Sequence, residues 1–312
     1  MIPRWLCTAC VCALMLLAAA CRNGPPDDPP PPEDLGPDWF KDITKESGID
    51  HAYKNGEEDS PHLAILESLG GGIALLDYDG DGLPDVFIPG GGRFAGKDRK
   101  TLEGRPCKLY RNLGGGKFKD ATKEAGLESL AGGAPWFYTH GAAAADYDRD
   151  GFPDLLVTGW GRVALFKNVP VDPKDPKKGR RFVDASKEAK LDKATEWTTS
   201  AAWGDLDGDG YPDLYLCQYV DWSWTNNPEH KYDGVTRDVA PPKKFSGLDH
   251  KVFRNHGDGT FDDVSATAGL KREAMAEAQK RDPRADKYNP MEQSKGLGVL
   301  MADFDGDGKP DV

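Results

Sequence analysis

Aspartates gather in four short stretches whose spacing suits a metal ion. The first stretch reads DYDGDGLPDVF from Asp77, and its pattern returns from Asp146, Asp205 and Asp303. Every copy has aspartate at positions 1, 3, 5 and 9, glycine at position 6 and proline at position 8. Carboxylates this close repel one another, so each stretch is either a solvated acidic turn or the ligand set of a cation. Four copies with the same residue positions favour the cation.

The chemistry that this spacing suits is calcium binding. Calcium takes six to eight oxygen ligands at about 2.3–2.6 Å, and carboxylates at alternate positions of a curling loop point to one centre. Glycine at position 6 allows a sharp turn, and proline at position 8 favours an extended position 7, whose carbonyl supplies another oxygen. Magnesium suits the loop less well because it demands rigid octahedral geometry and keeps its waters.

The predicted calcium ligands are the four aspartates of each copy and the backbone carbonyl of position 7. Arg149 stands at position 4 of the second copy, where the other copies have glycine. We expect little effect from it, because position 4 supplies no side-chain ligand. The predicted ligand residues are Asp77, Asp79, Asp81, Leu83, Asp85, Asp146, Asp148, Asp150, Phe152, Asp154, Asp205, Asp207, Asp209, Tyr211, Asp213, Asp303, Asp305, Asp307, Lys309 and Asp311.

Short strands must position these loops, and they recur with them. A Gly/Ala-rich segment such as THGAAAA or TTSAAWG precedes each loop, and an apolar β-prone run such as LLVTGW or LYLCQYV follows it. In the predicted unit a strand ending in F-x-D comes before the Gly/Ala-rich segment, and a strand ending in aromatic-x-Asn follows the apolar run. About four strands in each repeat of roughly 60–70 residues is typical of a β-propeller blade. A β-sandwich would not need so regular a repeat.

The two alternating motifs resemble a known family. D-x-D-x-D-G-x-P-D together with the turns NLGGGKFKD and NHGDGTFDD looks like the FG-GAP or VCBS repeat, and the F-x-D-x-T/S-x-x-A-G-L segments are similar to the cartilage acidic protein and ASPIC/UnbV branch. The resemblance covers nearly all of residues 38–312 and implies an all-β, calcium-binding β-propeller like the integrin α head. Family members are usually longer, so we expect a fragment with about four repeats that stops at Val312 inside a strand.

The N-terminus is predicted to be a targeting segment followed by a tether. Residues 1–20 have a positive charge at Arg4, an apolar run too short to span a bilayer, and small residues before Cys21. They resemble a bacterial lipoprotein signal, which implies lipidation of Cys21 and, with Arg22 next, an outer-membrane address. An ordinary secretory signal with a chance cysteine is the alternative. Residues 21–37 are rich in proline, which predicts an extended spacer.

Composition narrows the classes of function. The net charge of −12 argues against nucleic-acid binding. No nucleophile elbow, Walker loop or zinc spacing is present, so we predict no catalytic or cofactor-binding residues and no enzyme. Outside the predicted signal and Cys21, the cysteines are Cys107 and Cys217, and the sequence leaves open whether they form a disulfide.

Three functional hypotheses follow. The first is a calcium-binding, lipid-anchored module of the bacterial cell envelope that binds a protein or surface partner. The second is a polysaccharide-binding module that uses the aromatic insertion 221–247, where Trp222, Trp224 and Tyr232 could stack on sugar rings or else pack against the propeller rim. The third, less favoured, is a hydrolase. A second insertion, 271–290, is charged and predicted to contain a short helix.

Overall fold

The fold is built almost wholly of antiparallel β-sheets. A computed structural model describes residues 40–59, 62–97, 100–193, 196–270 and 295–312. The chain divides into a unit of residues 1–42 and a unit of residues 43–312, and every element described below belongs to the second unit. The predicted signal, the tether and the 271–290 insertion lie outside the described residues.

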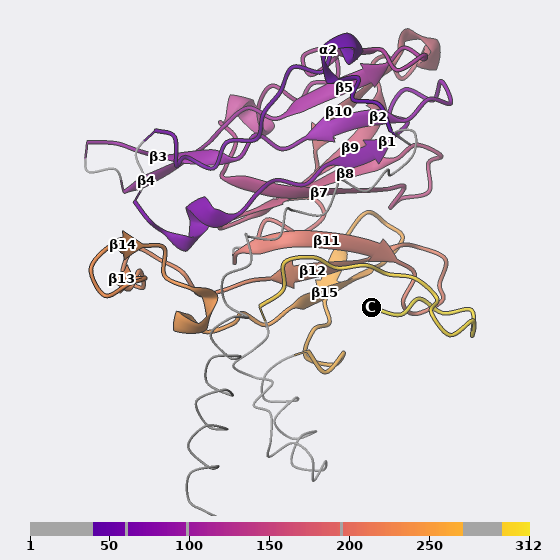
Figure 1. Cartoon of the computed structure of the whole chain (residues 1–312). Helices are drawn as coiled ribbons and strands as arrows, with labels where there is room; N and C mark the ends of the chain where they lie inside the picture. Colours follow the sequence, from indigo (N-terminus) through magenta and orange to yellow (C-terminus); the bar gives the residue numbers. More distant parts are fainter. Residues whose placement is uncertain (1–39, 60–61, 98–99, 194–195, 271–294) are drawn as a thin grey trace, which may run out of the picture. The chain divides into compact units, whose positions relative to one another are not determined.

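Three four-stranded sheets correspond to the first three sequence repeats (Figure 1). The first sheet has the strand order β1-β2-β5-β6, with bounds Ala74–Leu76, Asp85–Ile88, Lys108–Asn112 and Phe118–Asp120. The second has the order β7-β8-β9-β10, with bounds Thr139–Ala145, Asp154–Gly159, Val163–Pro170 and Arg180–Asp184. The third has the order β11-β12-β15-β16, with bounds Thr198–Gly204, Asp213–Gln218, Lys251–Asn255 and Phe261–Asp263.

Each sheet uses the predicted kinds of segment, but the F-x-D segment forms its last strand and not its first, because it pairs with the aromatic-x-Asn strand before it. The Gly/Ala-rich segment forms the first strand, the apolar run the second, the aromatic-x-Asn segment the third and the F-x-D segment the fourth. All neighbouring strands pair antiparallel, as β1 with β2 and β2 with β5 do. In the fourth repeat the described residues form a single isolated bridge between Ala302 and Asp311.

Two short hairpins and several helical turns accompany the three sheets. Two hairpins are inserted between the second and third strands of the first and third sheets: β3 and β4 (Gly92–Ala95, Thr101–Gly104) and β13 and β14 (His230–Lys231, Arg237–Asp238). The helical turns are α2 (Thr44–Ser47), η1 (Ile65–Ser68), η2 (Ala131–Gly133), η3 (Pro176–Lys178) and η4 (Pro242–Lys244). None of the helices in the described part of the chain is long and apolar enough to cross a membrane.

The first strands of the three sheets lie next to one another, β1 beside β7 and β7 beside β11 (Figure 1). The approach is close, because a Cβ added to Gly141 of β7 would lie 2.7 Å from the carbonyl oxygen of Thr199 in β11. Gly72 also donates its backbone N–H to the carbonyl of His140 at 2.7 Å. Small residues in these segments are therefore needed for close packing of neighbouring sheets.

The core lies between neighbouring sheets. Phe87 and Leu109 of the first sheet pack in one buried cluster with residues of the second, Leu155 and Phe166 among them. The next cluster joins the second sheet to the third through residues that include Leu156, Leu165, Leu214 and Phe253. Sheets that pack face to face around adjacent first strands give a β-propeller-like fold. The prediction of an all-β repeat fold is confirmed.

A third buried cluster lies at one end of the strands, where residues such as Tyr138 flank the second and third sheets. It contains Phe94 of β3 and Trp222 from the 221–247 insertion, and Trp160, which follows β8, and Trp224 pack against it. The rings of Phe94 and Trp224 are 5.0 Å apart, and those of Trp160 and Trp222 are 5.8 Å apart. We call this group the aromatic cluster. It places the tryptophans of the insertion in the interior, which was one of the two alternatives left open.

The two remaining cysteines are free. Cys107 precedes β5 in the first sheet and Cys217 lies in β12 of the third, and both are buried. The open question of a disulfide between them is therefore answered in the negative.

Candidate metal centres

The aspartate loops join the first strand of each sheet to the second. In the first loop, the Asp77 carboxylate accepts backbone N–H groups from Gly80, Asp81 and Gly82 at 2.8–3.1 Å. The carboxylate at position 5 accepts the N–H of position 7, as Asp81 does from Leu83 at 2.9 Å. The third and fourth loops repeat these bonds, and the second repeats all of them except the one from position 4. Each loop is thus folded around its own first aspartate.

In all four loops the aspartates at positions 1, 3 and 9 come together. One carboxylate oxygen from each lies within 4.8 Å of the others, a spacing that a single metal ion could bridge. The carboxylates at position 5, also predicted as ligands, are not part of these groups. The groups are Asp77, Asp79 and Asp85; Asp146, Asp148 and Asp154; Asp205, Asp207 and Asp213; and Asp303, Asp305 and Asp311.

The position 9 aspartates are the buried members of the first three groups. Asp154 accepts the backbone N–H of Tyr147 at 3.2 Å and that of Asn168 at 2.7 Å, so it ties the loop to the third strand. Its pKa is raised to about 8, chiefly by burial and also by the Asp148 charge, while these two hydrogen bonds act to lower it. Burial likewise raises the pKa of Asp85 to about 6 and raises that of Asp213. A nearby cation would offset the cost of ionising these groups.

The oxygen chemistry of the groups fits a hard divalent cation. Each group offers carboxylates from three residues and no nitrogen or sulfur. In the second loop, Oδ1 of Asp148 is buried and has no hydrogen-bond partner. A buried acceptor without a donor costs free energy, which a metal at this position would recover.

Glycine at position 6 adopts the left-handed conformation that the sequence predicted. Its φ is +84° at Gly82 and +94° at Gly151. Position 4 is left-handed as well, which was not predicted, with φ of +75° at Gly80 and +59° at Arg149. Glycine stands at position 4 in three loops because this backbone conformation favours it. The guanidinium carbon of Arg149 lies 5.4 Å from the ring centre of Tyr211, at position 7 of the third loop.

The asparagine of the aromatic-x-Asn segment is a second feature whose role the sequence did not reveal. Asn255 donates from Nδ2 to the carbonyl of Tyr147, at position 2 of the preceding loop, at 2.8 Å. Asn168 does the same to Tyr78 at 2.9 Å. Both asparagines are fully buried. Each therefore joins its own sheet to the aspartate loop of the sheet before it.

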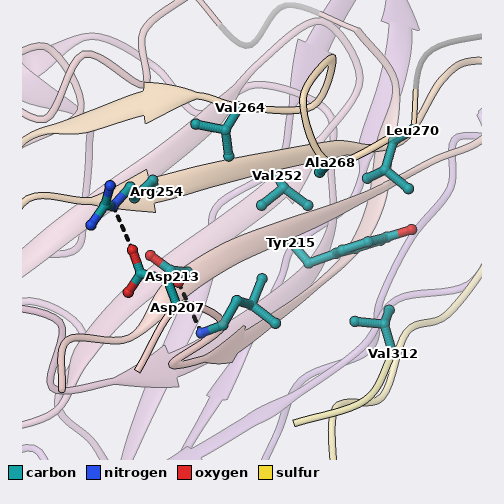
Figure 2. A pocket seen from close by; sticks show the side chains of 10 residues that line it. Asp207, Asp213, Tyr215, Val252, Arg254, Val264, Ala268, Leu270 and Val312 are labelled. Atoms are coloured by element: carbon teal, nitrogen blue, oxygen red, sulfur yellow. Dashed lines mark hydrogen bonds and ion pairs between the residues drawn. The ribbon is translucent and has the colours of Figure 1, made fainter. Parts of the chain in front are cut away.

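Beside the third loop lies a pocket of about 420 Å³ (Figure 2). Its apolar part includes Tyr215, Val252 and Leu270, and its polar end is marked by the ion pair between Arg254 and Asp207. Tyr215 stands two residues after Asp213 in the third sheet, and Leu156 stands two residues after Asp154 in the second, so the two occupy equivalent positions. The pocket is therefore the counterpart, on the third sheet, of the surface that the second sheet buries against the third.

Four-stranded sheets, each with an aspartate loop after its first strand, define a β-propeller-like repeat protein. The FG-GAP-like repeat family matches residues 77–157, which run from the first aspartate loop to the second strand of the second sheet. Cartilage acidic protein 1 of Homo sapiens is 24% identical over 212 residues, and that of Mus musculus is 24% identical over 211 residues. Together these comparisons show that the chain contains an FG-GAP-like repeat and is similar to cartilage acidic protein 1.

The similarity covers the two chains unequally. Each alignment takes in 67% of this chain, but 24% of the human protein and 25% of the mouse protein. The chain thus matches about a quarter of the length of these curated relatives. FG-GAP repeats indicate a module for protein interaction, and the aspartate groups could bind calcium.

Proposed function

We propose that the chain is a calcium-binding, lipid-anchored β-propeller module of the bacterial cell envelope that binds a protein or cell-surface partner. The observation that supports it best is the recurrence of one carboxylate group in four loops, with oxygens within 4.8 Å in each. In this proposal Cys21 bears the lipid, residues 21–37 form the tether, and the chain binds without catalysing a reaction.

Calcium suits these groups better than magnesium does. Three carboxylates leave room for further oxygens, from the position 7 carbonyl, the position 5 carboxylate or water, and calcium accepts six to eight. Magnesium would require six ligands at shorter and more regular distances. We expect dissociation constants in the range of extracellular calcium modules, about 10⁻⁴–10⁻³ M.

The arrangement of the 221–247 insertion favours a protein partner over a polysaccharide. Trp222 is buried in the aromatic cluster, so its ring is not available to a sugar, and Trp224 packs against the cluster and is partly buried. Tyr232 is 83% exposed and is the aromatic residue of the insertion that could stack on a ligand. Binding of glycans that is lost on Tyr232→Ala would revive the polysaccharide alternative.

Calorimetric titration with calcium tests the proposal, together with thermal melts in calcium and in EGTA. We expect three or four sites and a clear rise in melting temperature, and a much weaker response to magnesium. A folded chain that binds no calcium would overturn the metal assignment. Labelling of Cys21 by a radioactive fatty acid in a bacterial host, and its loss in Cys21→Ser, tests the anchor separately.

A further inference from the structure

The third strand of each sheet brings a basic side chain to the aspartate loop. Arg111, Lys167 and Arg254 each stand immediately before the asparagine of that strand. The pairing of Val86 with Tyr110 places Arg111 beside the start of β2, where the loop ends, and the pairings of Leu155 with Phe166 and of Leu214 with Phe253 do the same for the other two.

These side chains form ion pairs with the loop carboxylates. In the first loop, Nε of Arg111 lies 2.6 Å from Oδ2 of Asp79, and Nη2 lies 3.1 Å from Oδ2 of Asp81. In the third, Nε of Arg254 lies 2.5 Å from Oδ2 of Asp207 (Figure 2). Its Nη2 lies 3.7 Å from Oδ2 of Asp209. One arginine therefore spans positions 3 and 5 in each of these loops.

In the second loop, two basic residues make the contacts with positions 3 and 5 that a single arginine makes in the other two loops. Lys167 has one nitrogen and pairs with Asp148 at position 3. Arg180 of β10 supplies the missing contact, since its Nη2 lies 3.3 Å from Oδ2 of Asp150 at position 5. Positions 3 and 5 are thus paired with a cation in all three loops, although the residues that provide it differ.

We propose that Arg111, Lys167 and Arg254 are resident counter-cations of the aspartate loops, which compete with calcium for the carboxylates at positions 3 and 5. This inference rests on the proposed calcium binding. Without metal the cation offsets repulsion among the aspartates and keeps the loop folded. With metal it faces a divalent ion a few ångströms away, so it lowers the affinity of the loop for calcium.

If the basic residue instead assisted calcium binding, its removal would have the opposite effect on affinity. A cation that held the position 3 carboxylate in place for the metal would strengthen calcium binding, and its removal would weaken it. The fourth loop is an internal reference, because among the described residues no basic side chain is paired with Asp303, Asp305 or Asp307.

The decisive experiment compares Arg111→Gln/Arg254→Gln with the unchanged full chain by calcium calorimetry. A charge-matched control, Arg93→Gln/Lys178→Gln, removes two cations whose ion pairs, to Glu103 and Asp172, lie outside the loops. We expect two sites to tighten by about tenfold in the test variant, the change due to losing one unit charge near a divalent ion in a largely solvated loop. The control should keep its site affinities.

A melt in EGTA examines the metal-free role. The test variant should melt at a lower temperature than the control, and Arg111→Lys/Arg254→Lys should recover part of the loss because it restores the charge with one nitrogen. Unchanged or weaker calcium binding in the test variant, beside normal binding by the parent, would overturn this inference alone. A parent chain that binds no calcium would overturn the proposed function and the competition with it.

Discussion

The hydrogen bond from Asn255 to the aspartate loop of the preceding sheet can be tested by mutation, and Asn112 serves as a control in the same chain. Asn255 is fully buried, donates to the carbonyls of Tyr147 and Pro212, and accepts the N–H of Gly257. Asn112 of the first sheet makes the last two kinds of bond, to Pro84 and from Gly114. Asn255→Ala and Asn112→Ala therefore differ by the bond between sheets and by burial.

The expected losses follow from those bonds. Asn255→Ala removes three hydrogen bonds and leaves a buried carbonyl unpaired, which should cost about 3 kcal/mol. Asn112→Ala removes two bonds at a partly exposed site and should cost about 1 kcal/mol. The difference of about 2 kcal/mol corresponds to a further fall in melting temperature of about 4–8 °C.

Urea unfolding in saturating calcium, followed by circular dichroism, measures both free energies. The two variants should have the same dependence on urea concentration and different midpoints. Equal losses for both variants would refute the reasoning, because they would show that the contact between sheets contributes nothing beyond the local turn.

Three further predictions concern metal, pH and packing. Asp79→Asn/Asp81→Asn should lower the melting temperature in calcium and change it little in EGTA, and equal losses in both would count against the ligand assignment. Burial lowers the pKa of His140 to about 3, so the unfolded chain binds the proton more readily below pH 6.5. Stability should therefore fall by about 2 kcal/mol between pH 6.5 and 5, and a pH series of denaturation midpoints should show a smaller fall in His140→Gln. Trp222→Ala should cost about 3–5 kcal/mol by denaturation if the aromatic cluster is a true core, whereas a loss under 1 kcal/mol would argue for a surface role.

Local patterns in the sequence predicted the local structure well. The Asp, Gly and Pro spacing located every aspartate loop, and the alternation of small and apolar segments located the first two strands of each sheet. These features depend on residues close in the chain. The F-x-D segment at Phe40 is the exception, since residues 40–42 have no assigned strand while α2 follows at Thr44–Ser47.

Contacts between distant residues could not be predicted in the same way. The basic residue before each asparagine is visible in LYRN, LFKN and VFRN, but its contact with the loop depends on the register between the second and third strands. The link from Asn255 to Tyr147 spans 108 residues and depends on how two sheets pack. The same holds for the aromatic cluster, which gathers side chains from two insertions and from segments that flank the strands of the sheets.

The aromatic cluster and the aspartate loops lie at opposite ends of the same strands. Tyr138 and Trp160 of the cluster flank the start of β7 and the end of β8, while the second loop joins their other ends. The two ends therefore respond to different conditions: added salt screens the ionic end, whereas cooling weakens the apolar one. Added salt would therefore loosen the end with the aspartate loops, while the aromatic cluster still holds the sheets together at the other end.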